Sequence, residues 1–183
     1  MWVGENESSK YWLLVLNQLK ERGLEDILIV STDNLSGFSQ AIESVYPKTE
    51  IQKCVIHQIR NSTKFVSYRD IKELMKDLKT VYKASTEELA LSNLDIFEEK
   101  WGKKYPMCVN SWRNNWAELA TYFKYPEGIR KLIYTTNSIE NFNRQLRKVT
   151  KNKTIFPSDY ALQKSLYLAM VNASSKWTSR IRG

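Results

Sequence analysis

The stretch DILIVSTDNLSGF, residues Asp26–Phe38, decides the fold expected for this chain of 183 residues. Its apolar run Ile27–Val30 is short and is followed by a turn sequence, which predicts a strand over Ile27–Ser31 that is buried on both faces. A single carboxylate, Asp33, follows this strand, and Gly37 lies in the turn beyond it. An Asp at a strand end can open a turn or cap the next helix, and it can also belong to a functional site.

Strands and helices alternate around this stretch and indicate an α/β unit. The apolar spacing over Ser8–Arg22 predicts an amphipathic helix, and a second helix is expected over Ser36–Tyr46. Glu50–Ile56 has the composition of a further strand, and Met1–Gly4 is interpreted as the end of an earlier one. This order of elements predicts a sheet with at least partly parallel pairing.

The chain changes character after His57, because residues 58–124 show helical periodicity and no convincing strand. One helix is expected to begin at Ser85, with Glu88 completing a capping box. The aromatic residues of this region are expected to form a small core of their own; they are Trp101, Trp112, Trp116, Tyr122 and Phe123. The expected fold class is α/β and helix-rich overall, a mixed sheet with helices interrupted by an all-helical insertion.

The positive charge of the chain is concentrated in its last third. Residues 130–183 contain 11 Lys and Arg against two Asp and Glu, whereas residues 1–129 are close to neutral. This asymmetry indicates a polyanion such as DNA or RNA as a partner, and a solubilising basic surface is the alternative.

Two cysteines, Cys54 and Cys108, are too few and too far apart to indicate a disulfide framework, so reduced thiols are expected. The sequence contains no apolar run of about 20 residues and no signal-peptide pattern, which favours the cytoplasm and predicts no membrane partner. With a single histidine, Cys54, His57 and Cys108 offer at most three zinc ligands at unsuitable spacing, so a zinc hydrolase site is not expected.

A second candidate acid, Glu140, lies in a segment with the apolar spacing of a helix. At about 100° per residue, Glu140, Arg144 and Arg147 share one stripe of that helix. The expected core-facing stripe is a different one and contains Ile139, Phe142, Leu146 and Val149. Glu140 can simply form a capping box with Asn137 and an i, i+4 pair with Arg144.

Asp33 and Glu140 together suggest metal-dependent chemistry. Functional groups gather at the carboxyl ends of strands in α/β sheets, where Asp33 is expected. Carboxylates that converge there from a strand and a helix form a hard-oxygen site for Mg²⁺ or Mn²⁺. Two such ions can activate a water or a 3′-hydroxyl and stabilise the leaving oxygen during attack on a phosphodiester.

Four segments in the same order resemble the Mutator-type transposases of bacterial insertion sequences. They are WVGENES (Trp2–Ser8), DNLSGF (Asp33–Phe38), CVIH (Cys54–His57) and YTTNSIENFNRQLRK (Tyr134–Lys148). The last segment is the most specific, and the resemblance covers nearly the whole chain. Members of this family have an RNase H-like fold and an Asp-Asp-Glu catalytic triad, so the resemblance implies a partial fold of that kind here.

The resemblance makes Asp33 the second catalytic and metal-binding carboxylate and Glu140 the third, with Cys54 and His57 as structural residues near the site. Asn34 departs from the Gly that the family usually has, although Asn tolerates a left-handed backbone. The first catalytic Asp has no counterpart, so these residues are expected to be an inactive fragment of a transposase. The resemblance assigns residues 1–57 to the RNase H-like core, 58–126 to the insertion, and 127–183 to the helices that complete the core.

DNA is the partner implied by the resemblance, as transposon ends and as target, with Mg²⁺ or Mn²⁺ in a two-metal site of the intact enzyme. The expected contacts to the DNA backbone are Arg144, Arg147, Lys148, Lys151 and Lys153. Homo-oligomers and a place at the bacterial nucleoid are further expectations. The competing hypothesis is a non-catalytic, basic DNA-binding remnant, or a regulator of a full-length transposase.

Overall fold

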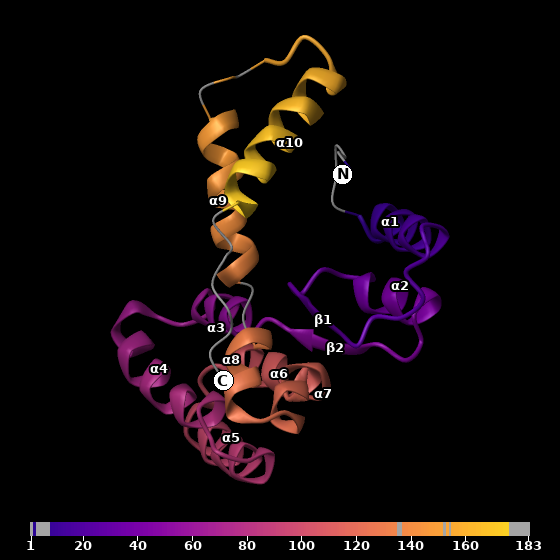
Figure 1. Ribbon diagram of the computed structural model, residues 1–183. Helices are drawn as coiled ribbons and strands as arrows, with labels where there is room; N and C mark the ends of the chain where they lie inside the picture. Colours follow the sequence, from indigo (N-terminus) through magenta and orange to yellow (C-terminus); the bar gives the residue numbers. More distant parts are fainter. Residues whose placement is uncertain (1, 3–7, 135–136, 152, 154, 176–183) are drawn as a thin grey trace.

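Two parallel strands, β1 (Ile29–Thr32) and β2 (Glu50–Lys53), form the sheet, with Ile29 opposite Glu50 and Thr32 opposite Lys53. The computed structural model describes residues 2, 8–134, 137–151, 153 and 155–175, which are coloured in Figure 1. The strands are joined by the helix α2 (Phe38–Val45). The predicted α/β start and its parallel pairing are therefore confirmed, while most of the predicted strand at Met1–Gly4 lies outside the described residues.

Strand β1 is less buried than the sequence predicted. Leu28 precedes the strand and is 81% exposed, and Val30 is only partly buried. The expectation of burial on both faces was wrong because the sheet has two strands in the described part of the chain, so one edge of β1 has no neighbouring strand there.

The helix α1 (Ser9–Glu21) packs against α2 (Figure 1). The Ser8 side chain caps α1 by accepting a hydrogen bond from the Tyr11 N–H, and Gly23 follows its end with a φ of 92°. Trp12 stacks on Phe38 at 4.7 Å between ring centroids. A small core lies between these elements; it consists of Leu16, Ala41, Ile42, Val45, Tyr46 and Ile51.

The strand predicted over Glu50–Ile56 ends at Lys53, and Cys54 instead caps the helix α3 (Val55–Thr63). The spacing of the buried side chains explains why a helix begins here. Val55 and Ile59 are buried together with Gln58 and Ser62, which gives the i, i+3, i+4, i+7 pattern of a helix. The two polar members hid this pattern in the sequence.

The described residues from Val55 to Lys124 form helices and connecting turns and contain no strand, as predicted. The helices are α3, α4 (Tyr68–Tyr82), α5 (Glu87–Trp101), α6 (Pro106–Asn114), α7 (Trp116–Leu119) and the 3₁₀ helix η1 (Thr121–Lys124). The cap of α5 is Thr86 rather than Ser85, since the Thr86 hydroxyl accepts the hydrogen bond from the Leu89 N–H.

The predicted aromatic core of this helical region is confirmed. Trp101, Trp112, Tyr122 and Phe123 are buried in one cluster with side chains from α3 to α6, and Trp116 packs against that cluster. Buried indole N–H groups need partners. Trp112 donates to the Ser62 hydroxyl at 2.8 Å, and Trp101 donates to the Asp77 carboxylate at 2.9 Å.

The chain then forms α8 (Glu127–Ile133), α9 (Asn137–Thr150) and α10 (Asp159–Ser174). Helices α9 and α10 pack on each other as a hairpin that projects from the rest of the molecule (Figure 1). The predicted core stripe of α9 is only partly buried: Phe142 and Leu146 are half-buried, but Ile139 is 53% exposed and Val149 is 38% exposed. None of the helices in the described ranges combines the length and the apolar composition that crossing a bilayer requires.

Candidate active site

Asp33 lies one residue beyond β1, in the turn that leads to α2. The Leu35 N–H donates to the Asp33 carbonyl at 2.8 Å, which closes a tight turn around Asn34. Asn34 does not use the left-handed backbone that Asn tolerates, whereas Gly37 at the N-terminus of α2 has a left-handed φ of 77°. The turn leaves the Asp33 side chain 58% exposed.

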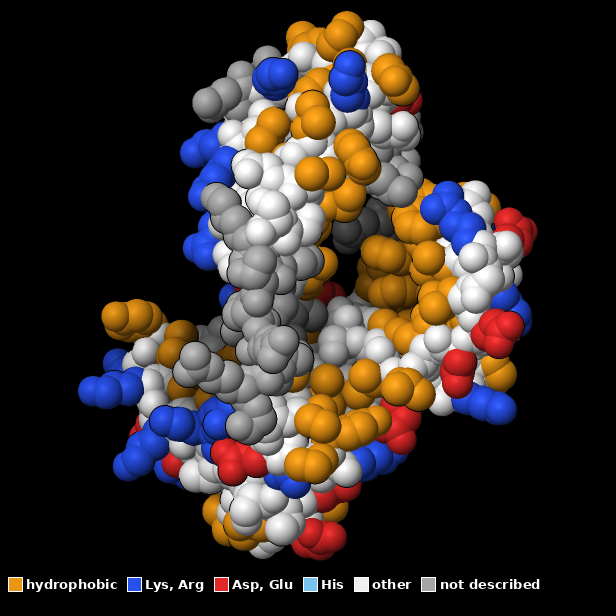
Figure 2. Space-filling view, in the orientation of Figure 1, with side chains coloured by type: hydrophobic (Ala, Val, Ile, Leu, Met, Phe, Trp, Pro, Cys, Tyr) orange, Lys and Arg blue, Asp and Glu red, His pale blue; other side chains and the backbone are white. Residues whose placement is uncertain are grey.

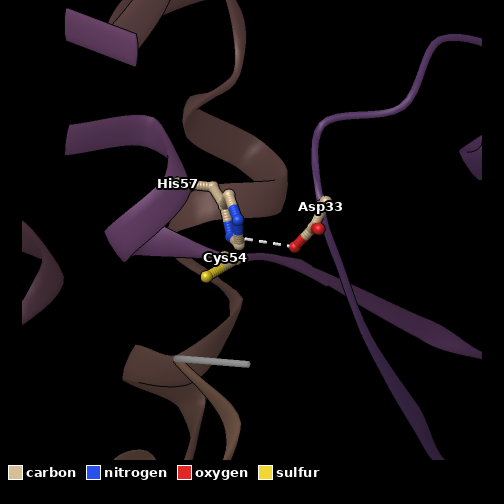
Figure 3. Close-up of side chains that lie close together, drawn as sticks. All are labelled: Asp33, Cys54 and His57. Atoms are coloured by element: carbon tan, nitrogen blue, oxygen red, sulfur yellow. Dashed lines mark ion pairs between the residues drawn. The ribbon is translucent and has the colours of Figure 1, made fainter. Parts of the chain in front are cut away.

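His57 faces Asp33 from the first turn of α3. The His57 Nδ1 atom lies 2.9 Å from Asp33 Oδ1, and the imidazole is 26% exposed. Cys54 lies three residues before His57, and Figure 3 shows its side chain close to those of His57 and Asp33, which follows β1. Their ligand atoms all lie within 4.8 Å of one another.

Glu140 reaches the other side of the same imidazole from the first turn of α9. The Glu140 Oε1 atom lies 3.7 Å from His57 Nε2. The two acids that are 107 residues apart in the sequence therefore flank one histidine ring in the structure. The side chain of Asn137 lies outside the described residues, as does the capping box that the sequence allowed.

Two hydrogen bonds at the end of α8 explain how α9 comes to start beside Asp33. The Ser31 hydroxyl of β1 donates to the Ile133 carbonyl at 2.8 Å. The Val55 N–H at the start of α3 donates to the Tyr134 carbonyl at 3.1 Å. These bonds attach the end of α8 to both the strand that precedes Asp33 and the helix that carries His57.

Arg60 is a site residue that the sequence reasoning missed. Its NH1 group donates to Glu140 Oε1 at 3.1 Å, and the two side chains are 56% and 39% exposed. A pair this exposed contributes about 0–1 kcal/mol to stability, so its effect is mainly to orient the carboxylate. The sequence did contain a signal for Arg60, because Arg60 follows His57 by three residues on a helix and therefore lies on the same side of it.

Of the basic residues expected to contact DNA, Arg144, Arg147 and Lys148 follow Glu140 along one side of α9, and the other two lie just beyond its end. All five of them are exposed; they are Arg144, Arg147, Lys148, Lys151 and Lys153. Lys and Arg line one edge of the α9–α10 hairpin in Figure 2. A hollow of about 500 Å³ beside them is lined by Glu140, Asn141, Asn143, Arg144 and Arg147. A phosphate in this hollow would lie next to the candidate acid.

The donor atoms present fit a hard divalent ion by chemical type. Carboxylate oxygens from Asp33 and Glu140 are the ligands that Mg²⁺ and Mn²⁺ prefer, and Mg²⁺ commonly uses one or two carboxylates together with water and substrate oxygens. Both carboxylates are partly open to solvent. The His57 ring lies between them, so each carboxylate offers its oxygens on its own side of the imidazole.

The chain is similar to known proteins along nearly its whole length. Residues 1–180 match the family described as "Transposase, Mutator family". The chain is 45% identical over 178 residues to "Transposase for insertion sequence element ISRM3" of Rhizobium meliloti (strain 1021), covering 97% of this chain and 44% of that protein. It is 46% identical to a probable transposase for an ISRM3-like element of Sinorhizobium fredii, with the same coverage. It is 32% identical to the IS905 transposase of Lactococcus lactis over 98% of this chain and 46% of that protein.

Proposed function

Because the chain belongs to the Mutator family of transposases, we propose that it supplies two carboxylates, Asp33 and Glu140, to the catalytic site of a DNA transposase. The observation that carries this proposal is that both acids flank the imidazole of His57, although 107 residues separate them. The chain spans less than half the length of the ISRM3 relative. The complete enzyme is therefore proposed to take its first catalytic Asp from elsewhere, and these 183 residues are proposed to be inactive alone.

Asp33 and Glu140 would hold Mg²⁺ or Mn²⁺, which supplies a Lewis acid for attack on a phosphodiester. The structure supports distinct tasks for the surrounding residues. His57 orients the Asp33 carboxylate through Nδ1, and Arg60 orients the Glu140 carboxylate. Arg144 and the basic residues that follow it would bind DNA phosphates next to these acids. The reaction proposed is strand cleavage at transposon ends and joining of the 3′-hydroxyl to target DNA.

The proposed architecture is part of an RNase H-like fold. Two parallel strands with helices, and an acid just beyond the first strand, support it. We assign residues 1–57 and 127–183 to that core and 58–126 to the helical insertion. Assembly as a homo-oligomer on DNA and a place at the nucleoid belong to the same proposal.

A second candidate function, DNA binding without catalysis, is favoured by one observation. The exposed basic side of α9 needs no metal to bind a phosphate backbone. A decayed transposase or a regulator of the intact enzyme would keep this surface while its acids lost their role.

The experiment that separates the two functions measures strand cleavage and DNA binding in a full-length protein that contains this sequence. Asp33→Asn or Glu140→Gln should lower cleavage of transposon-end DNA by at least about 100-fold, because metal assistance contributes several kcal/mol. DNA affinity should change little. Asp26→Asn is a matched control, since Asp26 is an exposed acid near the opposite end of β1. Cleavage by either variant at the wild-type rate would leave only the DNA-binding function.

A further inference from the structure

The side chains of Asp33, Cys54 and His57 form a donor set of a different kind from the two carboxylates. Cys54 and His57 stand three residues apart at the start of α3, and Asp33 meets them from the end of β1 (Figure 3). One thiol, one imidazole and one carboxylate thus place their ligand atoms within 4.8 Å of one another. We propose that this cluster is a site for a thiophilic transition-metal ion, Zn²⁺ above all, distinct in chemistry from the Mg²⁺ site.

The donor types decide between the two ions. Mg²⁺ requires oxygen ligands in near-octahedral geometry, and neither a thiolate nor an imidazole serves it well. Zn²⁺ takes sulfur, nitrogen and carboxylate oxygen in tetrahedral geometry, and sites with three protein ligands keep the fourth position for water. The Cys54 thiol would lose its proton to solvent on binding. A thiolate and a carboxylate would then balance the two charges of the ion.

The backbone already holds these ligands in position. The Cys54 N–H donates to the Thr32 carbonyl at 2.7 Å, which ties Cys54 to the strand that precedes Asp33. Cys54 is only 2% exposed, so its thiol cannot swing into solvent. The Nδ1 atom of His57 faces Asp33, and its Nε2 atom lies 3.7 Å from Glu140 Oε1. A carboxylate behind a metal-bound histidine is a common support in zinc sites.

The consequence for the enzyme rests on the proposed function. Zn²⁺ bound through Asp33 would withdraw that carboxylate from Mg²⁺ and fix His57 beside it. The two ions would then compete for Asp33, and Zn²⁺ would inhibit cleavage. The occupancy of the zinc site itself does not depend on any reaction, so it can be tested on this chain alone.

The test is a titration of the reduced 183-residue chain with Co²⁺, which reports thiolate ligation through a near-ultraviolet charge-transfer band. We expect the wild type to show the band. Zn²⁺ should remove the band by displacing Co²⁺, and excess Mg²⁺ should leave it unchanged. Cys54→Ser should abolish it. Cys108→Ser is the matched control, because Cys108 is equally buried but lies in the core of the helical region. The band should be unchanged in this variant.

Two further variants keep the test decisive if Cys54→Ser disturbs folding. His57→Gln and Asp33→Asn alter partly exposed side chains, and circular dichroism would check their fold. Each should weaken Zn²⁺ binding by at least about 10-fold, since even partners behind the ligands contribute that much. No band in the wild type, or a band that survives Cys54→Ser, would overturn the proposal. Neither result bears on DNA cleavage, which Glu140→Gln tests separately.

Discussion

The buried amide of Gln52 joins the sheet to the helical region, and replacing it should destabilise the protein strongly. Gln52 lies in β2 and is fully buried. Its Nε2 group donates to the Leu119 carbonyl at 2.9 Å and to the Lys53 carbonyl at 2.7 Å, and its Oε1 accepts from the Tyr122 N–H at 2.7 Å. Gln52→Leu keeps the approximate volume of the side chain and removes all three hydrogen bonds.

The expected loss follows from the groups left without partners. Leu119 and Tyr122 are both buried, so neither the carbonyl of the first nor the N–H of the second can turn to water. Each unsatisfied buried group costs about 1–3 kcal/mol. After the gain from burying a more apolar side chain, we expect Gln52→Leu to lower the free energy of unfolding by about 2–4 kcal/mol.

Gln58 provides a matched control for the same substitution. It is also buried, at 2% exposure, but within the described part of the chain its Nε2 donates only to the Ser111 hydroxyl, at 2.7 Å. Its Oε1 has no hydrogen-bond partner among the described residues. Gln58→Leu removes that unsatisfied oxygen, and the partly exposed Ser111 can bond to water. The free energy of unfolding should therefore change by less than about 1 kcal/mol.

Urea unfolding followed by tryptophan fluorescence would measure both variants. The slope of the free energy against urea must stay the same for the comparison to hold. We expect Gln52→Leu to lower the free energy of unfolding by at least about 1 kcal/mol more than Gln58→Leu does. Equal losses would show that the hydrogen bonds of Gln52 do not join the sheet to the helical region as described.

Three further predictions concern other parts of the chain. Arg147→Gln should weaken DNA binding without regard to sequence and reduce the slope of log affinity against log salt by about 1; an unchanged slope would remove Arg147 from the interface. Gly23→Ala should lower the free energy of unfolding by about 1–2 kcal/mol. Gly37→Ala should lower it by more, and the urea midpoints of the two variants would measure the difference. Both glycines have positive φ, but only at Gly37 would a new Cβ meet a neighbour, at 2.9 Å, whereas nothing lies within 4 Å at Gly23. The hydrogen bond from Lys104 lowers the pKa of Asp70 from 3.8 to about 2, so this carboxylate stabilises the fold above about pH 4 and loses that effect as the pH falls toward 2. As the pH is lowered from about 4 toward 2, the midpoint of unfolding should therefore fall less steeply in Asp70→Asn than in the wild type.

Local patterns predicted the elements whose buried faces are apolar. The spacing of Trp12, Val15, Leu16 and Leu19 predicted α1, and the short apolar run before Asp33 predicted β1. The pattern failed at α3 because Gln58 and Ser62 occupy buried helix positions. Their partners, Ser111 and Trp112, lie about 50 residues away, so no local signal identified them as core.

The extent of burial was predicted less well than the elements themselves. The apolar stripe of α9 has helical spacing, which the structure confirms, yet α10 is the helix against which α9 packs and much of the stripe stays exposed. Periodicity shows which side of a helix is apolar, but the presence of a neighbour decides whether that side is buried.

The two acids of the candidate site were predicted from the sequence, whereas Arg60 and the arrangement of the side chains were not. Asp33 and Glu140 were expected to lie together because of a family resemblance. The contacts that place them are the bond from Ser31 to the Ile133 carbonyl and the bond from Val55 to the Tyr134 carbonyl. Backbone carbonyls carry no mark in a sequence, so these contacts required the structure.

Cleavage of the chain by Fe²⁺ and ascorbate would test most directly the proposal that Asp33 and Glu140 bind one metal site. Bound Fe²⁺ generates radicals that cut the nearby backbone, and excess Mg²⁺ should protect against them. We expect cuts both in the turn at Asp33 and at the start of α9, suppressed by Mg²⁺, lost in Asp33→Asn and retained in Asp26→Asn. Cuts at only one of the two segments, or a pattern that Asp33→Asn leaves unchanged, would contradict a site shared by the two acids.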